Sequence, residues 1–403
     1  MLLNIDNIPY VGRHGKVEYR TSHAIAMYVD RYLSDEDVFY VEFFNGTDLL
    51  HADLTSYVKP DILKQIQNNQ IKIAFHNIHE GFNNISISIL KLVAKYGIPT
   101  KNVIIITANH DLKIWTERAA QRINTQVPRI VLCESFEITA SRTLDYFISK
   151  IGSMEAWIKY TYHPDSITHQ YLNLNRRQRC HRPMLVCALI AKDLLETGKV
   201  SFGNSDFGEG EGNTQSEIID NVPAYWQAQP DLRKLIIQSR RKILDSLPLY
   251  LDTTDLVTNR ASSIPTDSEL YKQTLMSVVS ETTFFSHTCP WGIKMPEPGV
   301  FFSEKSWKPI LHHQPWIMVS QPYTLQAMKH KGYQTFNEFL DESYDYEEND
   351  HQRMFMVLRL IEKISKWTPE KNREFVEYTK PILRHNIELL HTKLSTGDFL
   401  GEL

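Results

Sequence analysis

The chain has 403 residues, which exceeds the length at which a single hydrophobic core usually stops growing, so two domains are expected. Its formal net charge of −4 argues against a strongly basic nucleic-acid coat, because phosphate neutralisation needs Lys and Arg clustered on one face, although a local basic groove is compatible with this charge. The four cysteines contain no close CxxC pair, so neither a disulfide framework nor a zinc cage is expected.

The N-terminal segment MLLNIDNIPYVGRHGK lacks the continuous apolar core of a signal peptide. No later stretch reaches the roughly 18 uninterrupted apolar residues that a membrane-spanning helix needs. Together with the cysteine pattern, these features predict a cytoplasmic protein.

Short β-rich runs alternate with amphipathic segments through the first part of the chain. This alternation is typical of a parallel sheet with right-handed helical crossovers, and it predicts a Rossmann-like layer. The predicted strands cover Val38–Phe44, Ile71–Ile78, Asn102–Asn109 and Arg129–Ser135, and the predicted helices cover Asp61–Asn69, Ser86–Tyr96, Leu112–Ile123 and Ala140–Ile151.

The segment TYHPDSITHQ contains turn-forming residues, and a second alternating series begins after it. We therefore place a boundary near residue 165, which gives domains of residues 1–165 and 166–403. The sequence predicts an α/β protein whose two Rossmann-like domains face a cleft, followed by C-terminal helices. The second set of predicted strands covers Tyr171–Arg177, Lys199–Gly203, Leu247–Leu251, Met276–Glu281 and Trp316–Ser320, and the helices lie near Pro183–Thr197, Leu232–Leu244, Arg353–Trp367 and Lys371–Leu394.

Two acidic segments are predicted to lie outside the sheets. GNSDFGEGEGN, residues 203–213, is predicted to be a mobile loop and not a phosphate cradle, because it has no Lys and its carboxylates would repel phosphate. Asp341–Asp350 is predicted to be a solvated turn before the terminal helices.

The segment YLNLNRRQRCHRP, residues 171–183, runs from a predicted strand straight into a helix. In α/β sheets ligands bind at this end of a strand, and a helix N-terminus favours an anion. Guanidinium groups also present a fixed fork of donors that suits a pyrophosphate. The segment is therefore a candidate diphosphate site, with a solvated basic turn or a nucleic-acid backbone contact as alternatives. Its candidate ligands are Arg176, Arg177, Arg179, His181 and Arg182.

A second informative segment, FFSEKSWKPILHHQPWIMVS, covers residues 301–320 and follows the strand-like VVSETTFF. Ser303 can cap a helix, Glu304 can accept hydrogen bonds from ribose hydroxyls, and Lys305 can meet a phosphate. Pro309 predicts that this helix is short or kinked. An ordinary capping box with surface charges is the alternative interpretation.

The Arg-rich turn and the later SEKSWKPI together resemble glycosyltransferases of the GT-B superfamily, especially the fucosyltransferase-like pattern in which an acidic-Lys pair opens the helix under the nucleotide. They are also similar to phage-encoded proteins with LNRRxRxHR and SEKxWKPI segments, which would place this protein in the host cytoplasm. The resemblance covers roughly residues 165–340. It implies that Arg179, Glu304 and Lys305 bind a nucleotide diphosphate and that Glu281 lies near the sugar or ribose. No family signature appears in the N-terminal half, so the acceptor is not carried over.

An inverting sugar transfer needs a carboxylate or His that takes the proton of the acceptor hydroxyl. Glu80 follows a predicted strand in HNIHEG and is the first candidate base, with Asp53, His110 and Asp111 as alternatives after other strands. Each of them can instead be a helix cap or part of a polar loop. The two histidines of HNIHEG have no third metal ligand at a recognisable spacing, and the chain has no clear DxD motif. Metal-independent chemistry is therefore predicted, with Arg and Lys balancing the charge of the leaving diphosphate.

These interpretations predict a glycosyltransferase that moves a sugar from a nucleotide-sugar donor to an acceptor hydroxyl without a separate cofactor. The phage resemblance suggests a hydroxymethylated base in DNA as one acceptor, and a cell-surface or capsid glycan is the other. The alternative is a non-catalytic nucleic-acid- or protein-binding module on a degenerate α/β scaffold, which would not need the acidic-Lys pair at residues 304–305. The absence of GxxxxGK[ST] and GxGxxG argues against a P-loop or dinucleotide enzyme.

Overall fold

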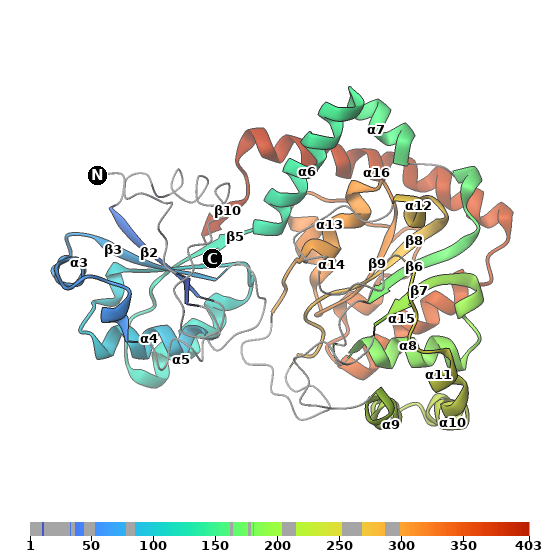
Figure 1. The fold of residues 1–403 in the computed structure, drawn as a ribbon, viewed down its shortest axis with the longest axis horizontal. Helices are drawn as coiled ribbons and strands as arrows, with labels where there is room; N and C mark the ends of the chain where they lie inside the picture. Colours follow the sequence, from blue (N-terminus) through green and yellow to red (C-terminus); the bar gives the residue numbers. More distant parts are fainter. Residues whose placement is uncertain are drawn as a thin grey trace. The chain divides into compact units, whose positions relative to one another are not determined.

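The computed structural model describes residues 10–11, 33, 37–43, 53–77, 85–161, 164–175, 179, 181–203, 215–251, 268–286 and 299–402. They form an α/β protein with two separate sheets (Figure 1). One compact unit comprises Met1–Thr139, Met295–Phe302 and Lys393–Leu403, and the second comprises Ala140–Lys294 and Ser303–Thr392. Within the described residues, no helix combines the length and the apolar character needed to cross a membrane.

The sheet of the first unit has five parallel strands and one antiparallel strand, in the order β1-β2-β3-β4-β5-β10. Its central strands β3 and β4 are buried along nearly their whole length, as expected for a parallel sheet covered on both faces. The strands are β1 (Tyr10–Val11), β2 (Val38–Phe43), β3 (Lys72–Asn77), β4 (Val103–Thr107), β5 (Arg129–Cys133) and β10 (Leu400–Glu402).

The two faces of this sheet are covered in different ways. Its parallel strands follow one another in sequence, so right-handed crossovers bring the connecting helices onto a single face. That face packs against α3 (Pro60–Gln67), α4 (Ile85–Lys95) and the start of α5 (Leu112–Ile123), and Figure 1 shows α4 and α5 below the strands. On the opposite face, the core includes side chains from remote parts of the chain, among them Phe301 and Phe399. The core of the first unit therefore includes C-terminal residues.

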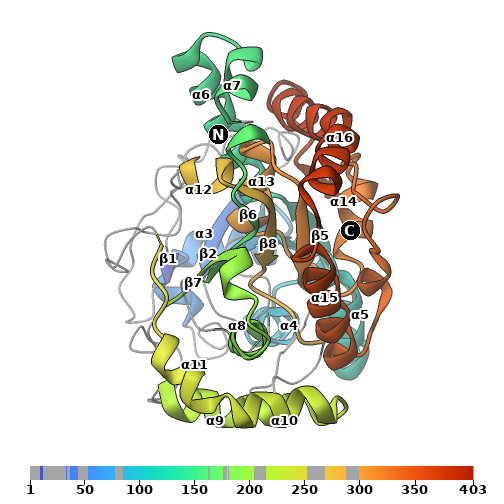
Figure 2. The same cartoon turned by 90° about the vertical axis from the view of Figure 1, so that its right-hand side faces the viewer.

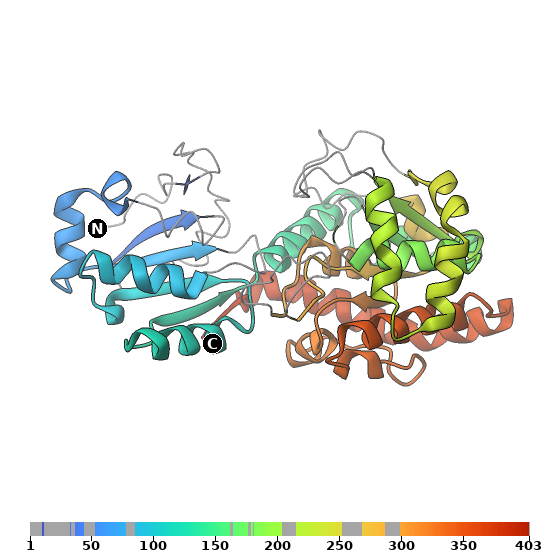
Figure 3. The ribbon, with the colours of Figure 1, turned by 90° about the horizontal axis from the view of Figure 1, so that it is seen from below.

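The sheet of the second unit has four parallel strands in the order β7-β6-β8-β9. Figure 3 shows α9 and α10, both yellow-green, side by side, and Figure 2 shows the two long C-terminal helices, α15 and α16, in red. The strands are β6 (His169–Asn175), β7 (Gly198–Phe202), β8 (Thr274–Ser280) and β9 (Trp316–Val319), and the helices are α6 (Ser135–Ile151), which begins in the first unit, α7 (Met154–Thr161), α8 (His181–Ala191), α9 (Gln215–Tyr225), α10 (Pro230–Gln238), α11 (Arg240–Ser246), α12 (Ser268–Lys272), α13 (Glu304–Leu311), α14 (Thr324–His330), α15 (Asp350–Ile364) and α16 (Pro369–Thr396).

The α/β class, the two parallel sheets and the C-terminal helices are confirmed. The predicted strand Leu247–Leu251 is wrong, because only Leu249 forms an isolated antiparallel bridge, to Phe202. The predicted helix Leu232–Leu244 is instead the pair α10 and α11, which meet at the non-helical Ser239. The predicted boundary near residue 165 falls inside the second unit, between α7 and β6, and most of the predicted loop 203–213 lies outside the described residues.

The acidic segment Asp341–Asp350 is partly exposed, as a solvated turn would be, but its carboxylates Glu342 and Asp345 are buried and bind main-chain N–H groups. The carboxylate of Asp345 accepts hydrogen bonds from the main-chain N–H groups of Leu325 and Gln326, at 2.8 and 3.0 Å, in the first turn of α14. Glu342, which is also buried, accepts one from the main-chain N–H of Phe336 at 2.7 Å. Carboxylates at a helix start satisfy N–H groups that have no partner within the helix, and these N–H groups could not be foreseen from the acidic composition.

A buried histidine after α13 makes the stability of the second unit depend on pH. His312 stacks on Tyr271 with ring centroids 4.0 Å apart. Burial, assisted by the charges of Lys308 and Lys272, lowers the pKa of His312 to about 3 from its usual 6.5. In the unfolded state the imidazole of His312 takes up a proton near its usual pKa of 6.5, whereas in the folded state it does so only near pH 3. The contribution of His312 to stability therefore falls as the pH drops from 6.5 toward 3.

We predict that His312→Phe reduces the loss of unfolding free energy between pH 7.5 and pH 5 by about 2 kcal/mol, since each unit of pKa shift corresponds to about 1.4 kcal/mol. Urea titrations at the two pH values measure this difference. His330→Phe, at an exposed position in the last turn of α14, is the matched control and should keep the wild-type dependence. An unchanged pH dependence in His312→Phe would show that the ring is not held neutral in the folded protein.

Candidate functional site

The second sheet has a topological switch point between β6 and β8, because β7 and β8 flank β6 on opposite sides. β6 pairs with β7 as far as Asn175–Phe202, and β8 pairs with β9 as far as Ser280–Val319. Within the described strands, however, the pairs between β6 and β8 end at Leu172–Ser277. The final three residues of these two strands are therefore not paired with each other, at the position where open α/β sheets bind ligands.

Buried side chains satisfy the main-chain carbonyl groups of β8 where pairing with β6 has ended. The amide of Asn173 donates to the carbonyl of Val278 at 2.7 Å. The guanidinium of Arg182 donates to the carbonyl of Ser280 at 3.2 Å and to that of Glu281 at 3.4 Å. Because a buried carbonyl without a donor is costly, these contacts explain why polar residues are buried here.

His181 and Arg182 open α8 and hold the loop after β8. The Nε2 atom of His181 is 2.9 Å from the carbonyl oxygen of Glu281, and its ring stacks on Phe284. Burial first, and the charge of Arg182 second, keep the pKa of His181 well below its usual value, so its ring is neutral. His181 and Arg182 therefore position this loop, and their predicted contact with a diphosphate stays a prediction. Arg179, at the start of the same turn, accepts a main-chain hydrogen bond from Arg182 at 2.9 Å.

The carboxylate of Glu281 is fully buried at the end of β8 and joins this strand to α13. Its Oε1 accepts hydrogen bonds from the main-chain N–H of Ser303 at 3.1 Å and from the hydroxyl of Ser306 at 2.5 Å. Its Oε2 accepts from the hydroxyl of Ser303 and from the main-chain N–H of Thr282, both at 2.7 Å. Protein donors contact both oxygens, so Glu281 positions the start of α13, and its predicted place near the sugar or ribose stays a prediction.

The start of α13 brings Ser303, Glu304 and Lys305 together as the sequence predicts. Ser303 caps the helix by accepting from the main-chain N–H of Lys305, and α13 is short, as Pro309 predicts. The ammonium of Lys305 lies 2.9 Å from the hydroxyl of Ser303 and 3.0 Å from the Glu304 carboxylate. Although burial raises the pKa of Glu304, the charges of Lys305 and Lys308 outweigh it and lower this pKa. An ionised carboxylate and an ammonium thus lie together at a helix N-terminus.

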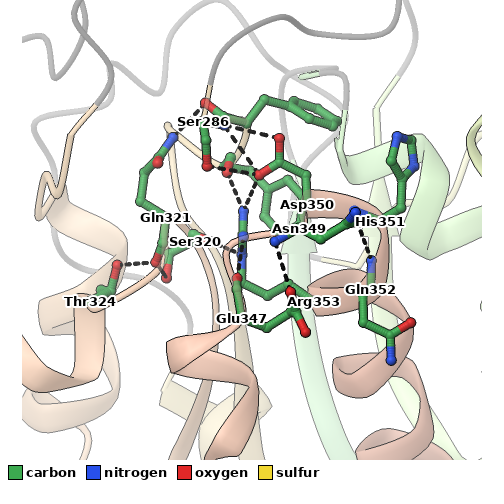
Figure 4. A network of polar contacts seen from close by, with 12 residues as sticks. Ser286, Ser320, Gln321, Thr324, Glu347, Asn349, Asp350, His351, Gln352 and Arg353 are labelled. Atoms are coloured by element: carbon green, nitrogen blue, oxygen red, sulfur yellow. Dashed lines mark hydrogen bonds and ion pairs between the residues drawn. The ribbon is translucent and has the colours of Figure 1, made fainter.

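A second polar network holds the far part of the loop after β8 (Figure 4). The buried guanidinium of Arg353, on α15, donates to the carbonyls of Phe284 at 2.6 Å and of Ser320 at 3.0 Å. Asp350 accepts from the main-chain N–H of Ser286 at 3.0 Å and forms an ion pair with Arg353 at 2.6 Å. The loop from residue 281 to residue 286 is therefore fixed at both ends to the carboxyl edge of the second sheet.

In the first unit, His110 and Glu134 follow the adjacent strands β4 and β5 and form a hydrogen-bonded pair. The Nε2 atom of His110 lies 2.6 Å from Oε1 of the buried Glu134, while the His110 side chain is 17% exposed. Toward an ionised carboxylate Nε2 is the donor, and whenever the imidazole is neutral its lone pair lies on Nδ1. The ring also packs edge-on against Phe302 at 5.2 Å. This arrangement can orient His110 as a general base.

Asp111 has a structural contact beside this pair. Its Oδ2 accepts from the main-chain N–H of Val300 at 3.0 Å, and the main-chain N–H of His110 donates to the carbonyl of Val300, also at 3.0 Å. The chain approaches so closely that a Cβ atom on Gly299 would lie 2.1 Å from Oδ1 of Asn109. Residues 299–300 are therefore held against the end of β4, and the carboxylate of Asp111 serves this contact.

Asp53 lies at the other edge of the first sheet. Its carboxylate accepts from the hydroxyl of Tyr96 at 2.7 Å, and Tyr96 follows the end of α4 just before β4 begins. Hydrogen bonds from Thr55 and then from Tyr96 lower the pKa of Asp53. The structure therefore does not bring Asp53 to the edge that carries His110. The first candidate base, Glu80, and two members of the Arg cluster, Arg176 and Arg177, lie outside the described residues.

Patterns in the sequence could have indicated some of these site residues. Glu134 directly follows the apolar strand β5, but the predicted strand Arg129–Ser135 included Glu134 and so hid this position. Asn173 and Asn175 alternate with leucines in β6, which places two amides on one face of a buried strand. No such pattern identifies Arg353, because two of its main-chain partners, Phe284 and Ser320, come from distant segments.

No protein-family model matches this chain, and no curated protein matches it. Among the described residues, no group of three or more His, Cys, Asp or Glu side chains could hold a metal ion.

We predict that Glu281→Ala lowers the unfolding free energy by about 2–4 kcal/mol, because it leaves several buried donors without an acceptor. Urea unfolding followed by tryptophan fluorescence, to which Trp307 in α13 contributes, measures the loss. Glu269→Ala removes a largely exposed carboxylate paired with Lys272, and as the matched control it should change stability little. A similarly small effect of Glu281→Ala would mean that the carboxylate does not hold α13.

Proposed function

We propose that this protein is a GT-B-type glycosyltransferase that binds a nucleotide-sugar in its second unit and transfers the sugar to an acceptor hydroxyl. The observation that carries the proposal is the Glu304–Lys305 pair at the N-terminus of α13, which Glu281 connects to the end of β8 beside the switch point. Two parallel α/β sheets are consistent with this class of enzyme.

The second unit offers the electrostatic features that a leaving diphosphate requires. The side chain of Lys305 is 23% exposed. Its ammonium lies at a helix N-terminus, where main-chain N–H groups add partial positive charge. Both features stabilise negative charge that grows on the diphosphate as the sugar leaves. The ionised Glu304 beside Lys305 can accept hydrogen bonds from ribose hydroxyls, and Arg179 adds a further cation at the start of α8.

The first unit offers a general base for the acceptor. Nδ1 of His110 can take the proton of the attacking hydroxyl, while Glu134 stabilises the imidazolium that forms. This base replaces Asp53, which lies at the other edge, and Asp111, whose carboxylate binds Val300. For the acceptor we retain the two classes that the sequence suggests, a hydroxymethylated base in phage DNA and a glycan.

The ligand for this test is the nucleoside diphosphate that binds best among UDP, GDP, ADP and CDP. We predict that Lys305→Ala weakens its affinity by about tenfold to a hundredfold, since a charge-assisted hydrogen bond contributes about 1.5–3 kcal/mol. Arg179→Ala should act in the same direction. Isothermal titration calorimetry measures both, and Lys234→Ala, at an exposed position of α10, serves as the matched control with near wild-type affinity. Unchanged affinity in both Lys305→Ala and Arg179→Ala would contradict the nucleotide site.

We predict that His110→Gln lowers the rate of nucleotide-sugar hydrolysis, with water as the acceptor, by about 10²–10⁴-fold, the usual contribution of a general base. Affinity for the donor should not change, because a base acts on the acceptor proton. Glu134→Gln should also slow hydrolysis, since a neutral amide does not stabilise the imidazolium. Asp53→Asn removes a carboxylate from the other edge of the same sheet and should retain full activity. A fully active His110→Gln would exclude His110 as the base.

A further inference from the structure

Hydrogen bonds fix the orientation of two buried amides at the switch point. Asn173 donates from Nδ2 to the carbonyl of Val278 at 2.7 Å, and a carbonyl can only accept, so the amide nitrogen of Asn173 must lie on that side. Its oxygen therefore faces Asn175, which donates from Nδ2 at 2.5 Å. This contact in turn places Oδ1 of Asn175 away from Asn173.

Among the residues that the structure describes, the Oδ1 atom of Asn175 is a buried acceptor without a hydrogen-bond partner. The residue is 1% exposed, and its main-chain groups are both satisfied, the N–H by the hydroxyl of Ser201 at 3.1 Å and the carbonyl by the N–H of Gly203 at 3.1 Å. Nearly all buried polar atoms in folded proteins have partners, so an exception requires a reason. Asn175 is the last residue of β6, beyond the point where β6 and β8 stop pairing.

The chemistry of this atom restricts what can satisfy it. A carbonyl oxygen accepts hydrogen bonds and donates none, so an ionised phosphate oxygen, which also only accepts, is not a suitable partner. A hydroxyl group of a sugar is suitable. The cationic Lys305 suits the phosphates, whereas the neutral acceptor of Asn175 suits a different part of the same ligand.

We propose that Oδ1 of Asn175 accepts a hydrogen bond from a hydroxyl group of the bound nucleotide-sugar, and that this contact selects ligands that carry this hydroxyl. The inference depends on the proposed function. The hydroxyl is either the 2′-hydroxyl of the ribose or a hydroxyl of the transferred sugar, and a comparison of three kinds of ligand separates these two sources.

The test is calorimetric titration of wild-type protein, Asn175→Ala and Ser201→Ala with three probes. The first probe is the nucleoside diphosphate that the wild-type protein binds best, and the second is its 2′-deoxy analogue. The third is the set of corresponding nucleotide-sugars. Ser201→Ala is the matched control, because it removes a hydrogen bond to the main chain of Asn175 but leaves its side chain in place. We expect Asn175→Ala to lose at least about tenfold in affinity and Ser201→Ala to stay within about twofold of the wild-type protein.

The pattern across the probes decides the result. If the ribose supplies the hydroxyl, Asn175→Ala loses affinity for the diphosphate but not for its 2′-deoxy analogue, and the wild-type protein discriminates between these two. If the transferred sugar supplies it, the loss appears only with a nucleotide-sugar. If Asn175→Ala binds all probes as tightly as the wild-type protein does, or loses affinity equally for all of them, the inference is overturned. The proposed function is not affected by either result.

Two further outcomes complete the test. Failure of the wild-type protein to bind any of the probes overturns the proposed function and this inference together. If circular dichroism shows that Asn175→Ala does not fold, the affinities of the wild-type protein for the probes still test the inference. Equal wild-type affinity for ligands with and without each hydroxyl contradicts it.

Discussion

The early end of pairing between β6 and β8 is the constraint on which the second unit depends. Once the strands stop pairing after Leu172 and Ser277, buried main-chain carbonyls need other donors. Asn173, His181 and Arg182 provide them, which explains why amide, imidazole and guanidinium groups are buried at the carboxyl edge of this sheet. The same contacts fix the loop after β8.

The fixed loop allows Glu281 to remain buried, although no cation within the described residues pairs with it directly. A carboxylate removed from water is costly unless hydrogen bonds satisfy it, and four donors from neutral groups surround this one. Two of these donors belong to Ser303, whose hydroxyl also contacts the ammonium of Lys305. The position of Lys305 is therefore determined by the strand end and the helix cap together, and not by the side chain alone. Such preorganisation is what electrostatic stabilisation of a leaving group requires.

The sequence predicted best those elements whose causes are local. The bounds of α5 match the prediction, because its apolar spacing ends at Asn124, which adopts the left-handed conformation typical of a helix end. The start of α13 was also predictable, since Ser303 is both the cap and part of the motif. The burial of Asp345 and the role of Glu134 were not predictable in this way, because their partners come from other elements. The strand β10 was missed for a related reason: it is short and pairs with a strand more than 260 residues earlier in the chain.

β10 has a consequence for biosynthesis. The first unit contains residues from both ends of the described chain, since β10 pairs antiparallel with β5 and Phe399 contributes to the core on one face of the same sheet. Domains usually fold during synthesis in the order in which they leave the ribosome. Here the order is reversed for one unit: the second unit has all its residues available once Thr392 has emerged, whereas the first must wait for β10. The unit that is synthesised first therefore completes its fold last, and until then one edge of its sheet is open to chaperones or to wrong strand partners.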